Sequence, residues 1–207
     1  MVKRIRAAAA TAVLAALLAG CSSSTAPPAP RPEPSGSTSA NGATPHYPQA
    51  APSQLAGKVG TPPVQLPDAA QVNSQDPAAV SRAAVTVIWT MDTDIDVSQH
   101  NAEVRATPFY SARHAAEVAN AAPQAAPGAD WAQWSQHRAY TTVALRPANE
   151  DGRPSDTPTE ATYRWSLTLN PIGRDGWHGT PQTMAVLTVL TRDDPSQPWR
   201  LDSLTLQ

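Results

Sequence analysis

The 207-residue sequence contains a single cysteine, Cys21, so no disulfide can form within the chain. It also lacks the G-x-S-x-G motif, the P-loop and G-x-G-x-x-G, and therefore has no hydrolase, nucleotide-binding or dinucleotide-binding signature. No two of its five histidines have the H-x-x-x-H spacing that places a pair of zinc ligands on one helix face. Because these motifs are absent, we expect no cofactor, and the sequence gives little support to an enzymatic function.

The N-terminus is typical of a bacterial secretory signal. Three basic residues precede an apolar run from Ala7 to Leu18, which is shorter than the stretch of about 20 residues that spans a bilayer. The run ends in a segment that resembles a lipobox, in which the cysteine is diacylated and becomes the mature N-terminus: Leu18, Ala19, Gly20 and Cys21. We expect residues 1–20 to be a signal peptide and Cys21 to hold the protein at the extracytoplasmic face of the cell membrane. An ordinary secreted protein with an accidental cysteine is the alternative.

Residues 21–75 have the composition of a tether. They contain eleven of the 22 prolines, together with Ser, Thr, Gly and Ala, and Tyr47 is their only aromatic residue. Such a segment cannot bury enough apolar area to offset the ordering of its backbone, so we expect disorder. A proline-rich ligand for a recognition domain is the alternative, but the paired prolines with basic flanks that it needs are missing.

Residues 76–207 are expected to form one domain. They hold all six tryptophans and no lysine, and ten arginines face fifteen acidic residues, a net charge of −5. A domain this acidic is a poor ligand for nucleic acid or for an anionic membrane surface. Membrane contact should therefore come from the lipid anchor alone.

The domain begins with a helical pattern. Asp76 followed by Pro77 is typical of a helix start, because an acidic cap precedes a proline at the first helical position. Apolar side chains then recur at helical spacing as far as Met91. Two more helices are expected over 98–106 and 111–122, and a single helical turn from Asp130.

Strand patterns follow the helices. We expect strands at 138–146, 161–170, 183–191 and 199–207, joined as hairpins, with a bulge between Leu201 and Leu204 where the apolar phase shifts. Helices before strands indicate an α+β fold in which the helices cover one face of a curved four-stranded antiparallel sheet. Three tryptophans inside regular elements, Trp89, Trp165 and Trp199, should lie in the core.

This order resembles the NTF2-like superfamily, whose members fold as a cone of helices and sheet. Within it, the chain is similar to envelope domains of TcpC-like conjugation and type IV secretion proteins. The stretches that carry the resemblance are AVTVIWTMDTD, ADWAQWSQHRAYTTVALRP, TYRWSLTLNPIGRDGWHGTP and PWRLDSL. A transmembrane helix usually holds such proteins, whereas here a lipobox takes its place.

The resemblance also implies where an active site would be. Enzymes of this superfamily place an Asp–His pair or a lone Asp at the mouth of the cone as general base. The residues of this chain that could serve there are Asp92, Tyr110, His114 and Tyr163. No motif selects among them.

One acidic pattern resembles a calcium loop. Four acidic positions of the EF-hand spacing are matched by Asp92, Asp94, Asp96 and Glu103. However, Val97 occupies the position that requires glycine, and Ser98 is expected to begin a helix within the stretch. A solvated acidic loop that caps the next helix is the favoured interpretation, and no metal site is expected.

Aromatic residues in short segments could form a partner surface. Trp131, Trp134 and Trp177 are the candidates, with core packing at the rim of the cone as the alternative. His178, beside Trp177 on a hairpin turn, is expected to be exposed.

These observations favour a membrane-anchored envelope lipoprotein that acts as a non-catalytic scaffold or assembly partner, with conjugation or secretion as its setting. Envelope proteins are the expected partners, and a small ligand is an open alternative. The second hypothesis is therefore a module that binds a small ligand or lipid in the cone pocket. The third is a small-molecule isomerase or dehydratase.

Overall fold

The structure, a computed structural model, describes residues 56–121, 128–148 and 155–207. The predicted signal peptide, the lipobox with Cys21 and the tether up to residue 55 lie outside these residues. The elements of the described chain are α1 (Pro77–Trp89), α2 (Gln99–Arg105), the 3₁₀ turn η1 (Thr107–Phe109), α3 (Ala112–Ala119), α4 (Ala129–Gln136), β1 (Tyr140–Pro147), β2 (Glu160–Ile172), β3 (Gln182–Thr191) and β4 (Arg200–Leu206). None of the helices in these ranges is long and apolar enough to span a bilayer.

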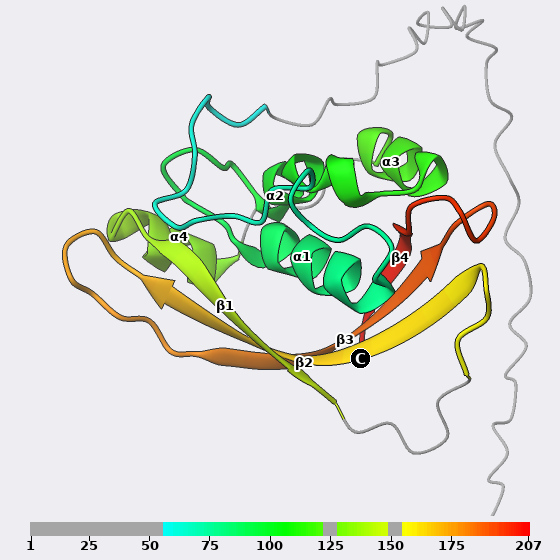
Figure 1. The fold of residues 1–207 in the computed structure, drawn as a ribbon. Helices are drawn as coiled ribbons and strands as arrows, with labels where there is room; N and C mark the ends of the chain where they lie inside the picture. The colour runs from blue at the N-terminus through cyan, green and yellow to red at the C-terminus, as the bar shows by residue number, and fades with distance from the viewer. Residues whose placement is uncertain (1–55, 122–127, 149–154) are drawn as a thin grey trace, which may run out of the picture. The chain divides into compact units, whose positions relative to one another are not determined.

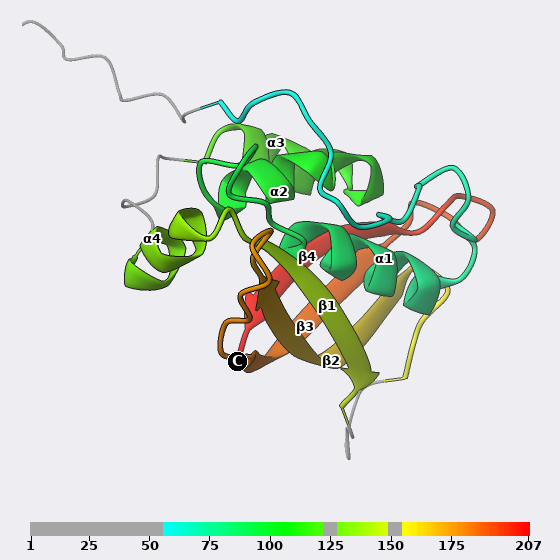
Figure 2. The same ribbon diagram turned by 90° about the vertical axis from the view of Figure 1, so that its left-hand side faces the viewer.

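The strands form one antiparallel sheet in the order β1-β2-β3-β4, so each strand pairs with the preceding strand of the chain. The sheet is curved, and helices α1 to α4 all lie on the same side of it (Figure 1, Figure 2). The predicted α+β class, with helices before strands and a four-stranded antiparallel sheet, is confirmed.

Polar caps set the helix starts as the sequence predicts. The carboxylate of Asp76 accepts hydrogen bonds from the backbone N–H groups of Ala78 and Ala79, at 2.9 and 3.2 Å. Ser111 accepts one from the N–H of His114 at 3.1 Å and so caps α3. Each cap satisfies N–H groups that have no partner inside the helix.

Two helices differ in length from the prediction. Helix α3 ends at Ala119 rather than at residue 122, because Asn120 takes the C-cap position and its side-chain amide donates to the carbonyl of Ala116 at 2.7 Å. Helix α4 has eight residues instead of the single turn expected from Asp130.

The core lies between α1 and the sheet. Helix α1 crosses the face of the sheet that curves around it (Figure 1). Buried side chains of α1 and of β2, β3 and β4 belong to one hydrophobic core cluster. Fully buried apolar side chains at this contact include Val80, Val85, Leu167, Leu169, Val186, Leu190 and Leu201. Each such side chain contributes about 2 kcal/mol by leaving water. The three tryptophans predicted in the core are buried: Trp89, Trp165 and Trp199.

The predicted bulge in the last strand is present. Val189 pairs with Ser203 while Leu190 pairs with Leu201, which leaves Asp202 as the extra residue of β4. The bulge turns this aspartate toward the start of α3, where Ser111 donates a hydrogen bond to it at 2.6 Å. The irregularity thus fastens α3 to an edge strand.

The folded part begins before Asp76, the residue at which the sequence predicts the domain to start. It includes residues 56–75, which we call the strap. Leu66, Ala69 and Val72 of the strap pack against the core, and the carbonyl of Ser74 accepts a hydrogen bond from Trp199 N–H at 2.8 Å. The strap runs over the helix layer and leads into α1 (Figure 1). Its proline-rich composition resembles that of the residues before it, so composition alone cannot reveal this packing.

Candidate functional site

The loop between α1 and α2, residues 90–98, carries two aspartates in buried ion pairs. Asp92 is completely buried, and Arg174 from the β2–β3 turn donates to its two oxygens at 2.9 and 2.8 Å. Asp96 is also buried and accepts two hydrogen bonds from Arg105 of α2, both at 2.9 Å. The expectation of a solvated acidic loop is therefore wrong for these two carboxylates, because arginines from outside the loop neutralise them.

The third aspartate of this loop is bound at the surface. Arg138 donates to Asp94 from Nη2 at 2.8 Å and from Nε at 3.2 Å, and Nε of Arg174 lies 3.4 Å away. The hydrogen bond from Arg138, followed by the charge of Arg174, holds the pKa of Asp94 below its usual value. We call Asp92, Asp94, Arg138 and Arg174 the charge cluster.

Arg138 reaches this cluster from an unusual backbone conformation. Its φ is 49°, in the left-handed region that favours glycine. It follows the C-cap of α4, where Ala139 N–H donates to the carbonyl of Trp134 at 2.9 Å and Arg138 N–H donates to Ser135 at 3.2 Å. This is a Schellman ending with arginine in the position that glycine usually fills. This left-handed backbone costs about 1 kcal/mol more for arginine than for glycine, but glycine has no side chain that could bind Asp94.

The four residues of the EF-hand-like pattern do not come together. Glu103 lies in α2 beside His100, with 3.5 Å between the carboxylate and Nδ1, while the aspartates face their arginines. Within the described ranges, no group of three or more His, Cys, Asp or Glu side chains is arranged to hold a metal ion. The calcium-like spacing therefore corresponds here to separate ion pairs.

The sequence did not reveal a contact between His137, the C-cap of α4, and Asp175 in the β2–β3 turn. Nδ1 of His137 lies 2.8 Å from Oδ2 of Asp175, and the ring of Trp177 stacks on the imidazole at 4.4 Å with 2° between the planes. The hydrogen bond with His137 lowers the pKa of Asp175. The two partners are 38 residues apart, so no local spacing indicates the pair.

This Asp–His pair lies at the surface of the domain. The side chains of His137 and Asp175 are 27% and 55% exposed. The hollow beside them measures about 150 Å³ and is lined by Gln136, His137, Arg138, Arg174 and Asp175. Both arginines are already bound to aspartates, so the hollow does not offer an unneutralised positive charge to a ligand.

Of the four residues considered for general acid–base roles, two meet. The rings of Tyr110 and His114 lie 4.5 Å apart, and the Tyr110 hydroxyl donates to the carbonyl of Glu103 at 2.8 Å. Burial, with a smaller effect of the Glu103 carboxylate, raises the pKa of Tyr110. Asp92 belongs instead to the charge cluster, and Tyr163 packs beside Trp165. The four therefore do not form one site.

The tryptophans proposed as a partner surface are mostly covered. Trp134 is only 7% exposed and belongs to the core, because α4 turns this face toward the domain. Trp131 of the same helix is half-buried, with its ring 6.2 Å from that of Trp134, and Trp177 is half-buried against His137. Trp134 must be removed from the candidate surface. His178 is exposed, as expected.

A chain of hydrogen bonds crosses the interior between α1 and the sheet. Trp165 Nε1 donates to the Ser81 hydroxyl at 2.8 Å, this hydroxyl lies 2.7 Å from that of Thr188, and Thr188 donates to the carbonyl of Tyr163 at 3.1 Å. Since the indole can only donate and the carbonyl can only accept, Ser81 donates to Thr188. The side-chain polar groups of Trp165, Ser81 and Thr188 thus satisfy one another.

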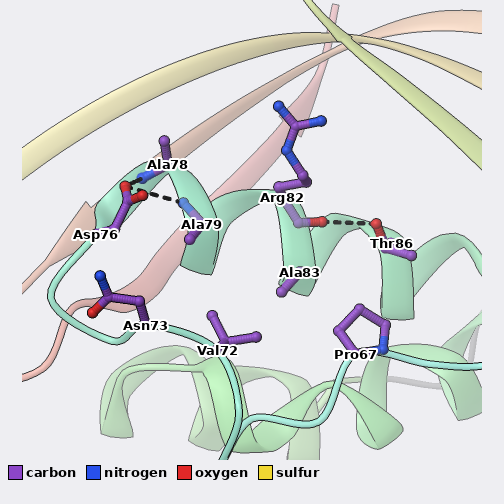
Figure 3. A pocket seen from close by; sticks show the side chains of 9 residues that line it. All are labelled: Pro67, Val72, Asn73, Asp76, Ala78, Ala79, Arg82, Ala83 and Thr86. Carbon is purple, nitrogen blue, oxygen red and sulfur yellow. Dashed lines mark hydrogen bonds between the residues drawn. The ribbon is translucent and has the colours of Figure 1, made fainter.

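A groove of about 440 Å³ lies between the strap and α1. Ala79 and Ala83 of α1 face Pro67 and Val72 of the strap across it (Figure 3). The remaining lining residues are Asn73, Asp76, Ala78, Arg82 and Thr86. The guanidinium group of Arg82 lies 4.7 Å above the ring of Trp165, and so one wall of the groove touches the interior of the domain.

No protein-family model matches this chain, and none of the curated proteins matches it. Among solved structures, a periplasmic fragment of TraM is similar over 63% of this chain and 93% of that fragment. The sequence identity is 14% and the TM-score is 0.41.

Proposed function

We propose that this protein is an envelope lipoprotein, anchored at the extracytoplasmic face of the cell membrane by a lipid on Cys21. Its domain, an NTF2-like cone in this proposal, acts as a non-catalytic scaffold or assembly partner. A conjugation or secretion machine is the favoured setting. The lipobox-like segment from Leu18 to Cys21 supports the anchor, and the resemblance of the sequence to TcpC-like envelope domains supports the setting.

The observation that carries the non-catalytic role is the filled interior. The space between α1 and the sheet, where an NTF2-like enzyme would hold substrate, contains side chains of the domain itself, among them Trp165, Leu167 and Leu190. Ser81 and Thr188 use their hydroxyls within the interior hydrogen-bond chain. An interior filled by the domain's own side chains in this way favours recognition through the outer surface.

The mechanism would be recruitment at the membrane. Stable anchoring needs at least two acyl chains, which a diacylated cysteine supplies. Confinement near the membrane raises the effective concentration of the domain toward envelope partners without any new contact. The net charge of −5 from residue 76 onward discourages binding of the domain itself to anionic lipid or nucleic acid.

A pull-down from native membranes in mild detergent tests this proposal. Full-length acylated protein should recover secretion or conjugation components, and the Cys21→Ala variant should not. Recovery of the protein alone would overturn the scaffold role. Recovery of the same partners with Cys21→Ala would show that partner binding does not require the lipid.

The groove beside the strap supports one alternative, a module for a small ligand or a lipid. Native mass spectrometry of the purified protein would detect a bound molecule. The Ala79→Phe variant should exclude such a molecule, because Ala79 lines the groove. A ligand retained by this variant would place binding elsewhere.

A further inference from the structure

We infer that the strap, residues 56–75, opens separately from the rest of the domain and thereby sets how far the domain reaches from the membrane. The effect on reach rests on the lipid anchor proposed above. The opening itself rests only on contacts of the described residues.

The N-terminal end of the strap is clamped on Ile95. The N–H of Lys58 donates to the carbonyl of Ile95 at 2.7 Å. A Cβ at Gly57 would lie 2.7 Å from that same carbonyl oxygen, and a Cβ at Gly60 would lie 2.5 Å from Cγ2 of Ile95. Both approaches are closer than real Cβ contacts, so this clamp requires glycine at two positions.

The loop that receives the clamp is braced from other sides. Ile95 lies between Asp94 and Asp96, which are bound by Arg138 and Arg105. Its own N–H donates to the carbonyl of Asp92 at 3.1 Å. The receiving loop is therefore fixed by ion pairs that do not involve the strap, and it can stay in place when the strap leaves.

The strap itself is held more weakly. In the described chain, two backbone hydrogen bonds join it to distant parts of the domain, at Lys58 and at Ser74, and a third joins Asn73 to the adjacent Asp76. The Gln75 side chain also donates to the carbonyl of Ser196 at 3.3 Å and accepts from Arg192 at 3.1 Å. Pro62 is buried, while Leu66, Ala69 and Val72, which pack against the core, are only partly buried. Segments with few buried apolar contacts open at a lower free energy than the whole domain.

Opening would change the tether in two ways. With the strap docked, the 34 residues from 22 to 55 separate Cys21 from the folded part, and with the strap released the number is 54. For flexible chains of these lengths the root-mean-square reach rises from about 33 Å to about 41 Å. The point at which the tether joins the folded domain also moves, from the neighbourhood of Ile95 to Asp76. The two points are separated by the length of α1, about 20 Å.

The chain offers a direct reporter of this opening. Its lysines are Lys3 and Lys58, so a lysine-specific protease can cut near the domain only after Lys58. We would digest the full-length protein in mild detergent. The Gly57→Ala/Gly60→Ala variant should be cut at least tenfold faster than wild type. Gly128→Ala is the matched control, because a Cβ there meets nothing within 4 Å, and its rate should not change.

The urea dependence of the same cleavage separates local from global opening. For a strap that opens alone, the cleavage rate should rise less steeply with urea than global unfolding does. Equal cleavage of wild type and the double glycine variant would overturn the clamp. Cleavage with the full urea dependence of unfolding would overturn separate opening.

The effect on reach can be measured on vesicles. A dye on a cysteine introduced as His178→Cys would report its distance from a dye in the bilayer by energy transfer. The double glycine variant should show lower transfer than wild type. Equal transfer, with both proteins bound, would overturn the reach role and leave the anchor intact. Failure of both proteins to bind vesicles would overturn the anchor, while the protease result would still decide strap opening.

Discussion

Arg174 donates two hydrogen bonds to the completely buried carboxylate of Asp92, and this pair joins the β2–β3 turn to the loop after α1. Asp92 also forms an isolated bridge with Tyr140, the first residue of β1, and the Arg174 guanidinium donates to the carbonyl of Arg138. One ion pair therefore connects the end of the first helix, the start of the first strand and a hairpin turn. Its desolvation cost offsets much of its attraction, but an unpaired partner would remain buried.

Replacing Arg174 with Met should lower the free energy of unfolding by about 3 kcal/mol, because it leaves the carboxylate of Asp92 buried without a cation. Urea denaturation followed by circular dichroism measures the loss. The Asp92→Asn/Arg174→Met double variant is the control and should be more stable than Arg174→Met alone. Equal losses of unfolding free energy in the single and the double variant would mean that water reaches the unpaired carboxylate of Asp92, so that the carboxylate pays no cost of burial.

The left-handed backbone of Arg138 gives a second prediction. Arg138→Gly removes about 1 kcal/mol of backbone strain and loses the surface ion pair with Asp94. Arg138→Ala loses the same pair and keeps the strain. The glycine variant should therefore be more stable than the alanine variant by about 1 kcal/mol in urea unfolding. Equal stabilities would contradict the assignment of strain to this position.

The interior hydrogen-bond chain distinguishes two neighbouring hydroxyls. Ser81→Ala leaves the indole N–H of Trp165 without an acceptor and should cost about 2 kcal/mol. Thr188→Val preserves shape and leaves the bond from Trp165 to Ser81 in place, so it should cost less, about 1 kcal/mol. Thermal unfolding of both variants checks the order. A larger loss for Thr188→Val would contradict the higher cost assigned to the unpaired indole N–H of Trp165.

Features that depend on neighbours in sequence could be predicted. The cap at Asp76 follows from an acidic residue before proline, and the bulge at Asp202 follows from the shift of apolar phase between Leu201 and Leu204. The α+β arrangement follows from the same local periods. These signals need only a few adjacent residues, and hence one sequence is enough to read them.

Features that depend on distant partners could not be predicted. The sequence around Asp92 suggested a solvated loop, because its partner Arg174 lies 82 residues away. The His137–Asp175 contact has no local pattern, since its partners come from a helix end and a hairpin turn. The packing of the strap could not be predicted, because its apolar residues are sparse. They become partly buried only through contact with the helix layer beneath them.

Stability in acid should depend on Asp202. The hydrogen bonds from Arg113, and then from Ser111, hold its pKa below the usual value in the folded protein. The carboxylate therefore stabilises the fold above the unfolded pKa of about 3.9, and this contribution is lost as pH falls through the folded pKa. Asp202→Asn should make the fall in thermal midpoint between about pH 5 and pH 2 shallower than in wild type. Asp193→Asn, which removes an equal charge from an exposed turn residue, controls for net charge and should keep the wild-type slope. An unchanged slope in Asp202→Asn would show that the bulge holds α3 without help from this charge.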